Sequence, residues 1–157
     1  MAEVSTKIAP NAVAEIVEGL TQALAETSVT TMKAQNYHWN VTGMAFGSLH
    51  ELFQTIYEDH FTGQDDLAER IKALGGHAEG RQSVYLKRSK VEECDGHKSD
   101  KDMIAALQGD QETMSATLRA LAHVAEQGGD IVTNDLAIQR ADVHDKFAWM
   151  LRAHLRG

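Results

Sequence analysis

Four side chains in the first half of the chain are of the types that bind transition metals: His38, His50, Asp65 and Glu69. Asp65 and Glu69 lie four residues apart, so on a helix they project from one face and can hold one cation together. Two carboxylates with imidazole nitrogen make a mixed oxygen and nitrogen ligand set, which suits iron, manganese or zinc better than calcium. A solvated acidic helix face is the alternative interpretation of the carboxylate pair taken alone.

The positions of the histidines argue against a site within one chain. His50 is expected near the start of the helix that carries Asp65, and fifteen residues at about 1.5 Å each separate the two by roughly 22 Å along a straight helix. One chain therefore cannot bring both to one metal. If this helix packs antiparallel against its copy across a two-fold axis, His50 of one subunit lies level with Asp65 and Glu69 of the other. The spacing predicts a metal site at a subunit interface, formed twice per dimer.

Composition limits the class of protein. The 157 residues suffice for one domain with a real core, and 43% hydrophobic content with one proline and few aromatic residues favours helices. A formal net charge of -8 argues against unaided nucleic-acid binding, which needs a basic surface. The single cysteine, Cys94, excludes an intrachain disulfide and is compatible with a reducing cytoplasm. No apolar run approaches the roughly 18 residues of a membrane span, and no signal-peptide core is seen. We expect a soluble, cytoplasmic protein.

Apolar residues at helical spacing predict four long helices. The first is expected from about residue 11 to residue 37, after Pro10, which leaves residues 1–10 as a short neutral tail and 11–157 as the domain. His38 then lies at the last turn of this helix. The remaining elements are a short helix and two long ones, expected over 83–93, from 99 or 100 to 127, and from 130 or 131 to 155. Four long helices in one domain predict an all-α four-helix bundle.

The second long helix has its own boundary signals. Ser48 followed by Glu51 matches a capping box, in which each side chain satisfies a free backbone N–H of the other, and predicts a start at Ser48. Gly75-Gly76 is expected to end it. Gly63 inside this helix costs about 1 kcal/mol relative to alanine, so it either marks a close approach of the partner helix or is simply tolerated.

Several other residues are interpreted without a metal. Trp39 is expected in the core, with shielding of the site from water as the alternative. His77, Cys94 and His97 have no ligand spacing and are interpreted as surface residues. Met103 and Met114 are interpreted as core residues rather than ligands. His123, His144 and His154 are interpreted as lone histidines on helices.

Five motifs extend from the first helix to the end of the chain: Y-H-W-N-V-T-G from Tyr37, L-H-E-L-F from Leu49, D-D-L-A-E-R-I-K-A-L-G-G from Asp65, G-D-I-V-T-N-D-L from Gly129 and H-D-K-F-A-W-M-L-R-A from His144. Together they resemble the Dps proteins, the ferritin-like DNA-binding proteins of starved cells. The resemblance implies a hollow dodecamer of ferritin-like four-helix bundles, with the short extra helix between the second and third long helices.

The resemblance also implies a ferroxidase centre across the two-fold interface, where Fe(II) is oxidised, commonly by hydrogen peroxide, and ferric mineral collects in the cavity. Asp65 and Glu69 correspond to the carboxylate ligands of the tighter iron, with Glu69 as a candidate bridge. His38 corresponds to its imidazole ligand from the other subunit, and His50 to the ligand of the second position. Many members carry an aspartate four residues after the second histidine, whereas this chain has Gln54, a poorer ligand for a dication.

Two further acids and two rival functions remain. Asp130 and Asp135 match acidic residues that line three-fold pores in similar proteins, where a carboxylate ring concentrates Fe(II); helix capping is the alternative for Asp130.

A DNA-compacting protein with little iron role is the rival function, although residues 1–10 offer only Lys7 as a basic side chain. A structural shell with an inactive site is the other rival. Either hydrogen peroxide or dioxygen can serve as the oxidant.

Overall fold

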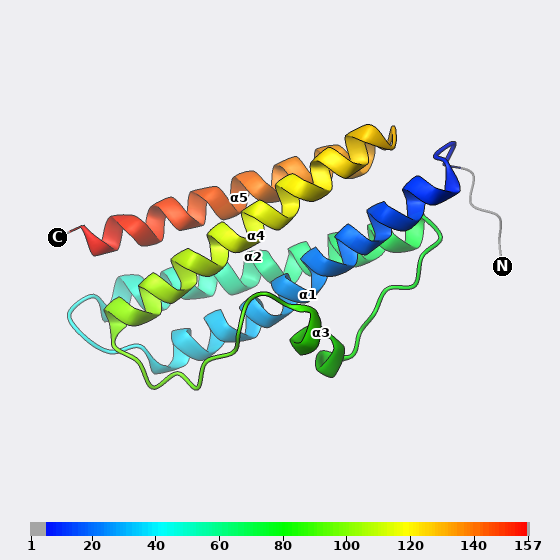
Figure 1. The fold of residues 1–157 in the computed structure, drawn as a ribbon. Coiled ribbons are helices and arrows are strands. Elements are labelled where there is room, and N and C mark those ends of the chain that lie inside the picture. The colour runs from blue at the N-terminus through cyan, green and yellow to red at the C-terminus, as the bar shows by residue number, and fades with distance from the viewer. Residues whose placement is uncertain (1–5, 157) are drawn as a thin grey trace.

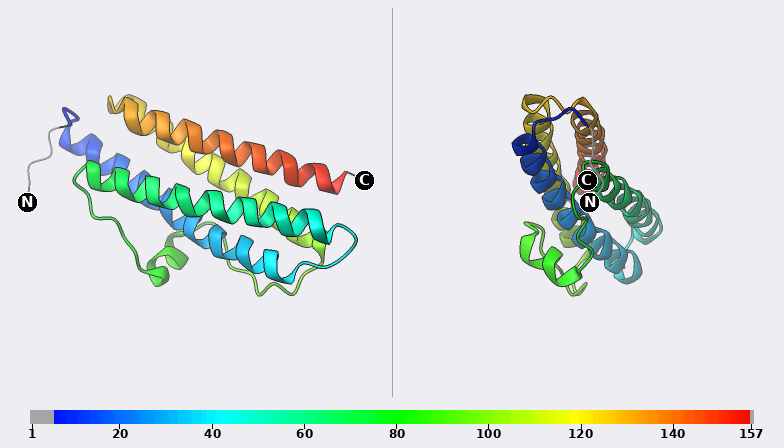
Figure 2. Two further views of the ribbon diagram at one scale, coloured as in Figure 1. Left: turned by 180° about the vertical axis from the view of Figure 1, so that it is seen from behind. Right: turned by 90° about the vertical axis from the view of Figure 1, so that its right-hand side faces the viewer.

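Four long helices run side by side, and one short helix lies outside them. The computed structural model describes residues 6–156, in which the helices are α1 Pro10–Asn40, α2 Phe46–Ala73, α3 Gln82–Arg88, α4 Asp100–Gln127 and α5 Ile131–Leu155 (Figure 1). α1 packs mainly on α2 and α4 mainly on α5, and the view along the bundle shows these two pairs (Figure 2). The predicted four-helix bundle with an extra helix after the second long helix is confirmed. Residues 1–5 of the predicted tail lie outside the described part.

The start of α2 differs from the prediction. The helix begins at Phe46, not at Ser48, and the Ser48 hydroxyl donates to the carbonyl of Ala45 at 3.1 Å from within the first turn. The predicted capping box is therefore wrong. Gly43 adopts a φ of 112°, and its carbonyl accepts from the Phe46 N–H at 3.1 Å, so a tight turn starts the helix earlier than the side chains suggested.

The later helices begin at polar caps. Ser99 accepts from the backbone N–H of Asp102 at 3.1 Å to cap α4, and Asp130 accepts from the Thr133 N–H at 3.0 Å to cap α5. Of the predicted alternatives, α4 therefore starts at Asp100 rather than at Ser99, and α5 starts at Ile131 rather than at Asp130.

The short helix α3 ends at Arg88 and does not continue to Glu93 as predicted. Ser89 turns the chain into an extended conformation. Val91 is then buried against Val29 and Met114, which holds the following segment against the bundle.

The core has two apolar clusters, one toward each end of the bundle. One cluster is built around Leu20, Ile71 and Leu121, and the other around Phe53 and Leu107, among other buried residues. The helix positions between these clusters carry polar side chains, which form a separate layer described below. The predicted core methionines are confirmed, because Met103 and Met114 are both buried.

The predicted exposure of four other side chains has different outcomes. His77 and His97 are exposed as expected, but Cys94 is half-buried against the core cluster around Phe53. Trp39, expected in the core, is 58% exposed in the single chain. Across residues 6–156, none of the helices combines the length and apolar character needed to cross a membrane.

Candidate metal centre

The end of α1 and the start of α2 bring two histidines into contact. The short loop between these helices turns the chain back at one end of the bundle (Figure 1). The imidazole rings of His38 and His50 stack with centroids 3.7 Å apart and planes inclined by 15°. His38 is buried, and His50 is half-buried. The structure therefore confirms that His38 lies in the last turn of its helix, and it pairs the two predicted histidine ligands within one chain.

Each of these two histidines is fixed by the backbone of the other. His38 Nδ1 lies 2.6 Å from the carbonyl oxygen of His50, and His50 Nδ1 lies 2.7 Å from the carbonyl oxygen of His38. A carbonyl can only accept, so each Nδ1 carries the proton and donates. The lone pair of each ring is then on Nε2. A hydrogen bond from Nδ1–H to a backbone carbonyl sets the tautomer and the orientation of an imidazole that binds a metal through Nε2.

Two aromatic rings flank the histidine pair. Phe46 stacks on His50 with centroids 5.1 Å apart, and Tyr57 meets the ring of His38 edge-on at 5.3 Å. Sequence reasoning missed both roles, because it placed Phe46 before the expected helix start at Ser48 and assigned Tyr57 no role at the site. The spacing of Tyr57, two helical turns after His50, was the available signal.

The predicted carboxylates lie elsewhere on α2. Asp65 and Glu69 are exposed, and within residues 6–156 neither forms a side-chain hydrogen bond or ion pair. In the described part of one chain, no three side chains of histidine, cysteine, aspartate or glutamate gather closely enough to hold a metal. One chain thus brings together His38 with His50, and separately Asp65 with Glu69, but does not join the two pairs.

The remaining predicted residues have contrasting environments. The Gln54 amide donates to Glu58 at 2.8 Å, so it is held by the next turn of α2. Asp130 is only 2% exposed and pairs with Arg70 at 2.8 Å while it caps α5. Asp135 is exposed on the outside of α5 and accepts from Gln139 at 2.7 Å. The contacts of Asp130 support the capping interpretation, whereas Asp135 is free to face solvent.

An apolar groove lies beside the histidine pair. It has a volume of about 770 Å³ and runs between α1, α2 and the segment that contains α3. Its lining includes Trp39, the neighbour of His38, and Phe61, which is 71% exposed. A second hollow next to it is lined by Phe61 and Asp65. Exposed apolar surface therefore extends from the histidine end of the candidate site to its carboxylate end.

The chain is similar in sequence and fold to several bacterial proteins. Residues 17–157 match the family Ferritin, described as a ferritin-like domain. DNA protection during starvation protein 2 of Bacillus anthracis is 35% identical over 141 residues, 90% of this chain and 97% of the relative. A Vibrio cholerae O1 Dps, described as a member of a broad superfamily of ferritin-like diiron-carboxylate proteins, has a TM-score of 0.92 at 27% identity over 99% of both chains. A Listeria innocua Dps with two histidines replaced by glycine has a TM-score of 0.87 at 28% identity, over 90% of this chain and 95% of that chain.

Fold and sequence agree on the class of protein. The four long helices and the match over residues 17–157 define a ferritin-like domain. Within that class, the similarity to the Bacillus anthracis relative and to the solved Dps structures is decisive. The chain belongs to the Dps family, as its sequence motifs predicted.

Proposed function

We propose that this protein is a ferroxidase and iron-storage subunit that protects the cell against oxidative stress. Fe(II) is its substrate, and each centre is formed by His38 and His50 of one chain with Asp65 and Glu69 of a second chain. Membership of the Dps family supports iron storage and protection. The reciprocal hydrogen bonds of the histidine pair carry the finer proposal, because they leave Nε2 of both stacked rings available as a ligand atom.

Two histidines with the spacing of His38 and His50 were replaced in a solved relative. The Listeria innocua Dps variant carries its two histidine replacements twelve positions apart. His38 and His50 have the same separation in this chain. That correspondence supports a functional role for the pair beyond packing.

The occupant of the apolar groove is a second copy of this chain. Trp39 and Phe61 expose large aromatic rings, and patches of this kind mark association surfaces. On α2 the groove is lined by Phe61 and Gln64, and the hollow next to it reaches Asp65. An antiparallel copy across a two-fold axis covers this surface and closes two centres at once. A dodecamer built from such dimers, located in the cytoplasm, belongs to the same proposal. Entry of Fe(II) past the exposed Asp135 is a further part of it.

The chemistry follows from the paired ligands. Two Fe(II) ions give up one electron each, and hydrogen peroxide takes both electrons with two protons to form two molecules of water. Because the electrons leave as a pair, no hydroxyl radical is released. Asp65 and Glu69 supply the negative charge that favours Fe(III) over Fe(II), and the imidazoles bind from the opposite chain.

Iron oxidation tests this proposal directly. Fe(II) added to the purified protein is followed by the absorbance of the ferric product, with hydrogen peroxide in one series and air in the other. We expect faster oxidation with peroxide, and rates equal to those with bovine albumin would refute the proposal. The name of the Bacillus anthracis relative describes DNA protection, but a net charge of -8 predicts no gel shift of plasmid DNA at physiological salt. A shift under those conditions would favour the DNA-compacting alternative.

A further inference from the structure

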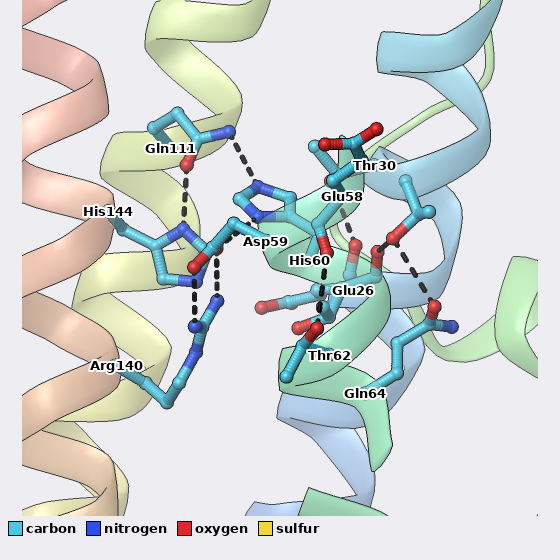
Figure 3. Close-up of polar contacts among 12 residues, drawn as sticks. Glu26, Thr30, Glu58, Asp59, His60, Thr62, Gln64, Gln111, Arg140 and His144 are labelled. Atoms are coloured by element: carbon cyan, nitrogen blue, oxygen red, sulfur yellow. Dashed lines mark hydrogen bonds and ion pairs between the residues drawn. The ribbon is translucent and has the colours of Figure 1, made fainter. Parts of the chain in front are cut away.

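A ring of buried polar side chains joins three helices in the middle of the bundle. His60 of α2 and His144 of α5 are both 0% exposed, and Gln111 of α4 lies between them (Figure 3). The Gln111 amide nitrogen is 2.9 Å from His60 Nε2, and the Gln111 amide oxygen is 2.6 Å from His144 Nδ1. The rings of the two histidines meet edge to face with centroids 4.8 Å apart. This layer separates the two apolar clusters of the core.

An ion pair closes the ring. Asp59 Oδ2 accepts from His60 Nδ1 at 2.9 Å and from Arg140 Nη2 at 2.8 Å, and Arg140 lies one turn before His144 on α5. Gly63 makes this possible, because a Cβ there would lie 2.7 Å from the Arg140 guanidinium. The helical glycine thus marks the close approach of a side chain from α5, which forms a partly buried ion pair between α2 and α5.

The donors and acceptors of the ring match when both histidines are neutral, and they cannot all match when both are protonated. Asp59 accepts from Nδ1–H of His60, and Nε2 of His60 accepts from the Gln111 amide. The Gln111 oxygen in turn accepts from Nδ1–H of His144. A proton added to His60 Nε2 would face the amide N–H group of Gln111, two donors in contact. Reversing the amide relieves this contact but turns a donor toward Nδ1–H of His144, so the ring cannot hold two protonated histidines.

His144 has the least tolerance for a proton. Its Nε2 is buried without a hydrogen-bond partner among the described residues, and the positive charge of the Arg140 guanidinium acts against a second positive charge on its ring. The same guanidinium disfavours a metal ion between the two histidines, because a second cation there would be repelled while Asp59 is already paired. The ring is therefore unsuited to hold a metal ion.

We propose that the ring of Asp59, His60, Gln111, Arg140 and His144 is an acid-sensitive latch that holds α2 against α4 and α5. Protons reach it through Asp59, whose side chain is 26% exposed while the other members are buried. When the histidines take up protons, the hydrogen bonds of Gln111 break and α2 separates from its neighbours. This proposal depends on contacts within one chain and is independent of iron chemistry.

The direction of the pH dependence follows from the groups that face the two rings. Burial lowers the pKa of His60, and the bond to Asp59 only partly offsets it. Burial, then His60 and Arg140, lower the pKa of His144. The charged groups acting on the rings are Asp59 of α2 and Arg140 of α5, while α4 contributes the neutral Gln111. Because the unfolded chain binds the extra protons, stability is complete above the ordinary histidine pKa of about 6.5 and falls as pH decreases below it.

Hydrogen exchange of the intact assembled protein at pH 7.5 and pH 5.5 tests the latch, after correction for intrinsic exchange rates. We expect protection to fall at pH 5.5 in peptides around residues 56–63 of α2 and 140–147 of α5. The matched variants are His60→Gln and His144→Gln, with the exposed His123→Gln of α4 as control. The unfolding constant should rise less steeply as the pH falls in each latch variant than in wild type, by up to about tenfold per pH unit, because one titrating histidine is removed. The control should leave the pH dependence unchanged.

Two outcomes would overturn the latch. One is an unfolding constant with the same pH dependence in wild type, His60→Gln and His144→Gln. The other is an acid-induced loss of protection confined to regions outside the two peptides. The second outcome is measured on the wild-type protein, so it applies even if both latch variants fail to fold.

Discussion

The two ends of α2 present the two halves of the proposed centre in opposite states. At its start, His50 is stacked on His38, and both rings are fixed by hydrogen bonds to backbone carbonyls. Toward its other end, Asp65 and Glu69 are exposed and unbonded within the described residues. The histidine half is organised by a single chain before any assembly, whereas the carboxylate half has to gain its constraint from a partner. This difference is the one expected if the proposed centre forms only when two chains associate.

Removing either half should have the largest effect. We expect the double variants His38→Ala with His50→Ala, and Asp65→Ala with Glu69→Ala, to lose at least about 100-fold in Fe(II) oxidation rate, because ligands matter at least as much as their second-shell partners. Stopped-flow absorbance measures the rate, and size-exclusion chromatography confirms assembly. A double variant that keeps the wild-type rate would remove its two residues from the centre.

A variant that prevents two chains from associating should lose Fe(II) oxidation, because the histidines and the carboxylates of the centre then stay apart. Phe61→Glu places a charge in the apolar groove, which should prevent association and abolish oxidation while the helical content of the chain is retained. Light scattering and circular dichroism measure the two quantities. Met44→Glu is the matched control, since Met44 is fully exposed outside the groove lining. Intact assembly of the Phe61 variant would show that the partner binds elsewhere.

A smaller effect is expected for metal affinity at the histidine end of the centre. Gln54 offers only an amide one turn after His50, and this amide is bound to Glu58. We expect Gln54→Asp to tighten the second metal position about tenfold, by analogy with a charge-assisted contact of about 1.4 kcal/mol. Anaerobic titration with Co(II), followed by its visible spectrum, measures the stoichiometry and affinity. Gln54→Asn is the control, and equal binding by both variants would contradict a role for this position.

The smallest expected effect concerns the ring beside His38. Tyr57→Leu removes an edge-on aromatic contact worth about 0.5–1.5 kcal/mol, so Co(II) affinity should fall by up to about tenfold. Tyr57→Phe keeps the ring and should bind Co(II) like wild type. If the Phe variant is impaired as much as the Leu variant, the hydroxyl matters and the contact has a different role.

Much of this molecule follows from its sequence. Helical periodicity predicted the bundle. Residue types and spacing also predicted that the two histidines and the two carboxylates stay apart in one chain, as they do among the described residues, whereas metal binding by these four side chains stays a prediction. Local signals were less reliable, because the start of α2 depends on the positive φ of Gly43, which overrides the Ser48 pattern. The shared nature of the centre remains a prediction, since it concerns contacts between chains.

The polar layer was the main feature that sequence reasoning did not predict. Sequence reasoning assigned His60 no polar role and interpreted His144 as a lone helical histidine, although both contact Gln111. Their partners come from helices more than thirty residues away in sequence, so helical spacing alone could not pair them. The available signal was Gly63 inside a long helix, which indicated a close approach but not that its cause was Arg140.

Complementation between two inactive variants tests the shared centre most directly. The variant without imidazoles and the variant without carboxylates are expressed together and co-assembled. In each mixed two-fold dimer one centre inherits both defects, but the other receives intact histidines from one chain and intact carboxylates from the other. We predict that Fe(II) oxidation returns, up to about half of the native centres within each mixed dimer. If mass spectrometry confirms mixed assemblies and no activity returns, the centre is not shared between chains and the central claim is wrong.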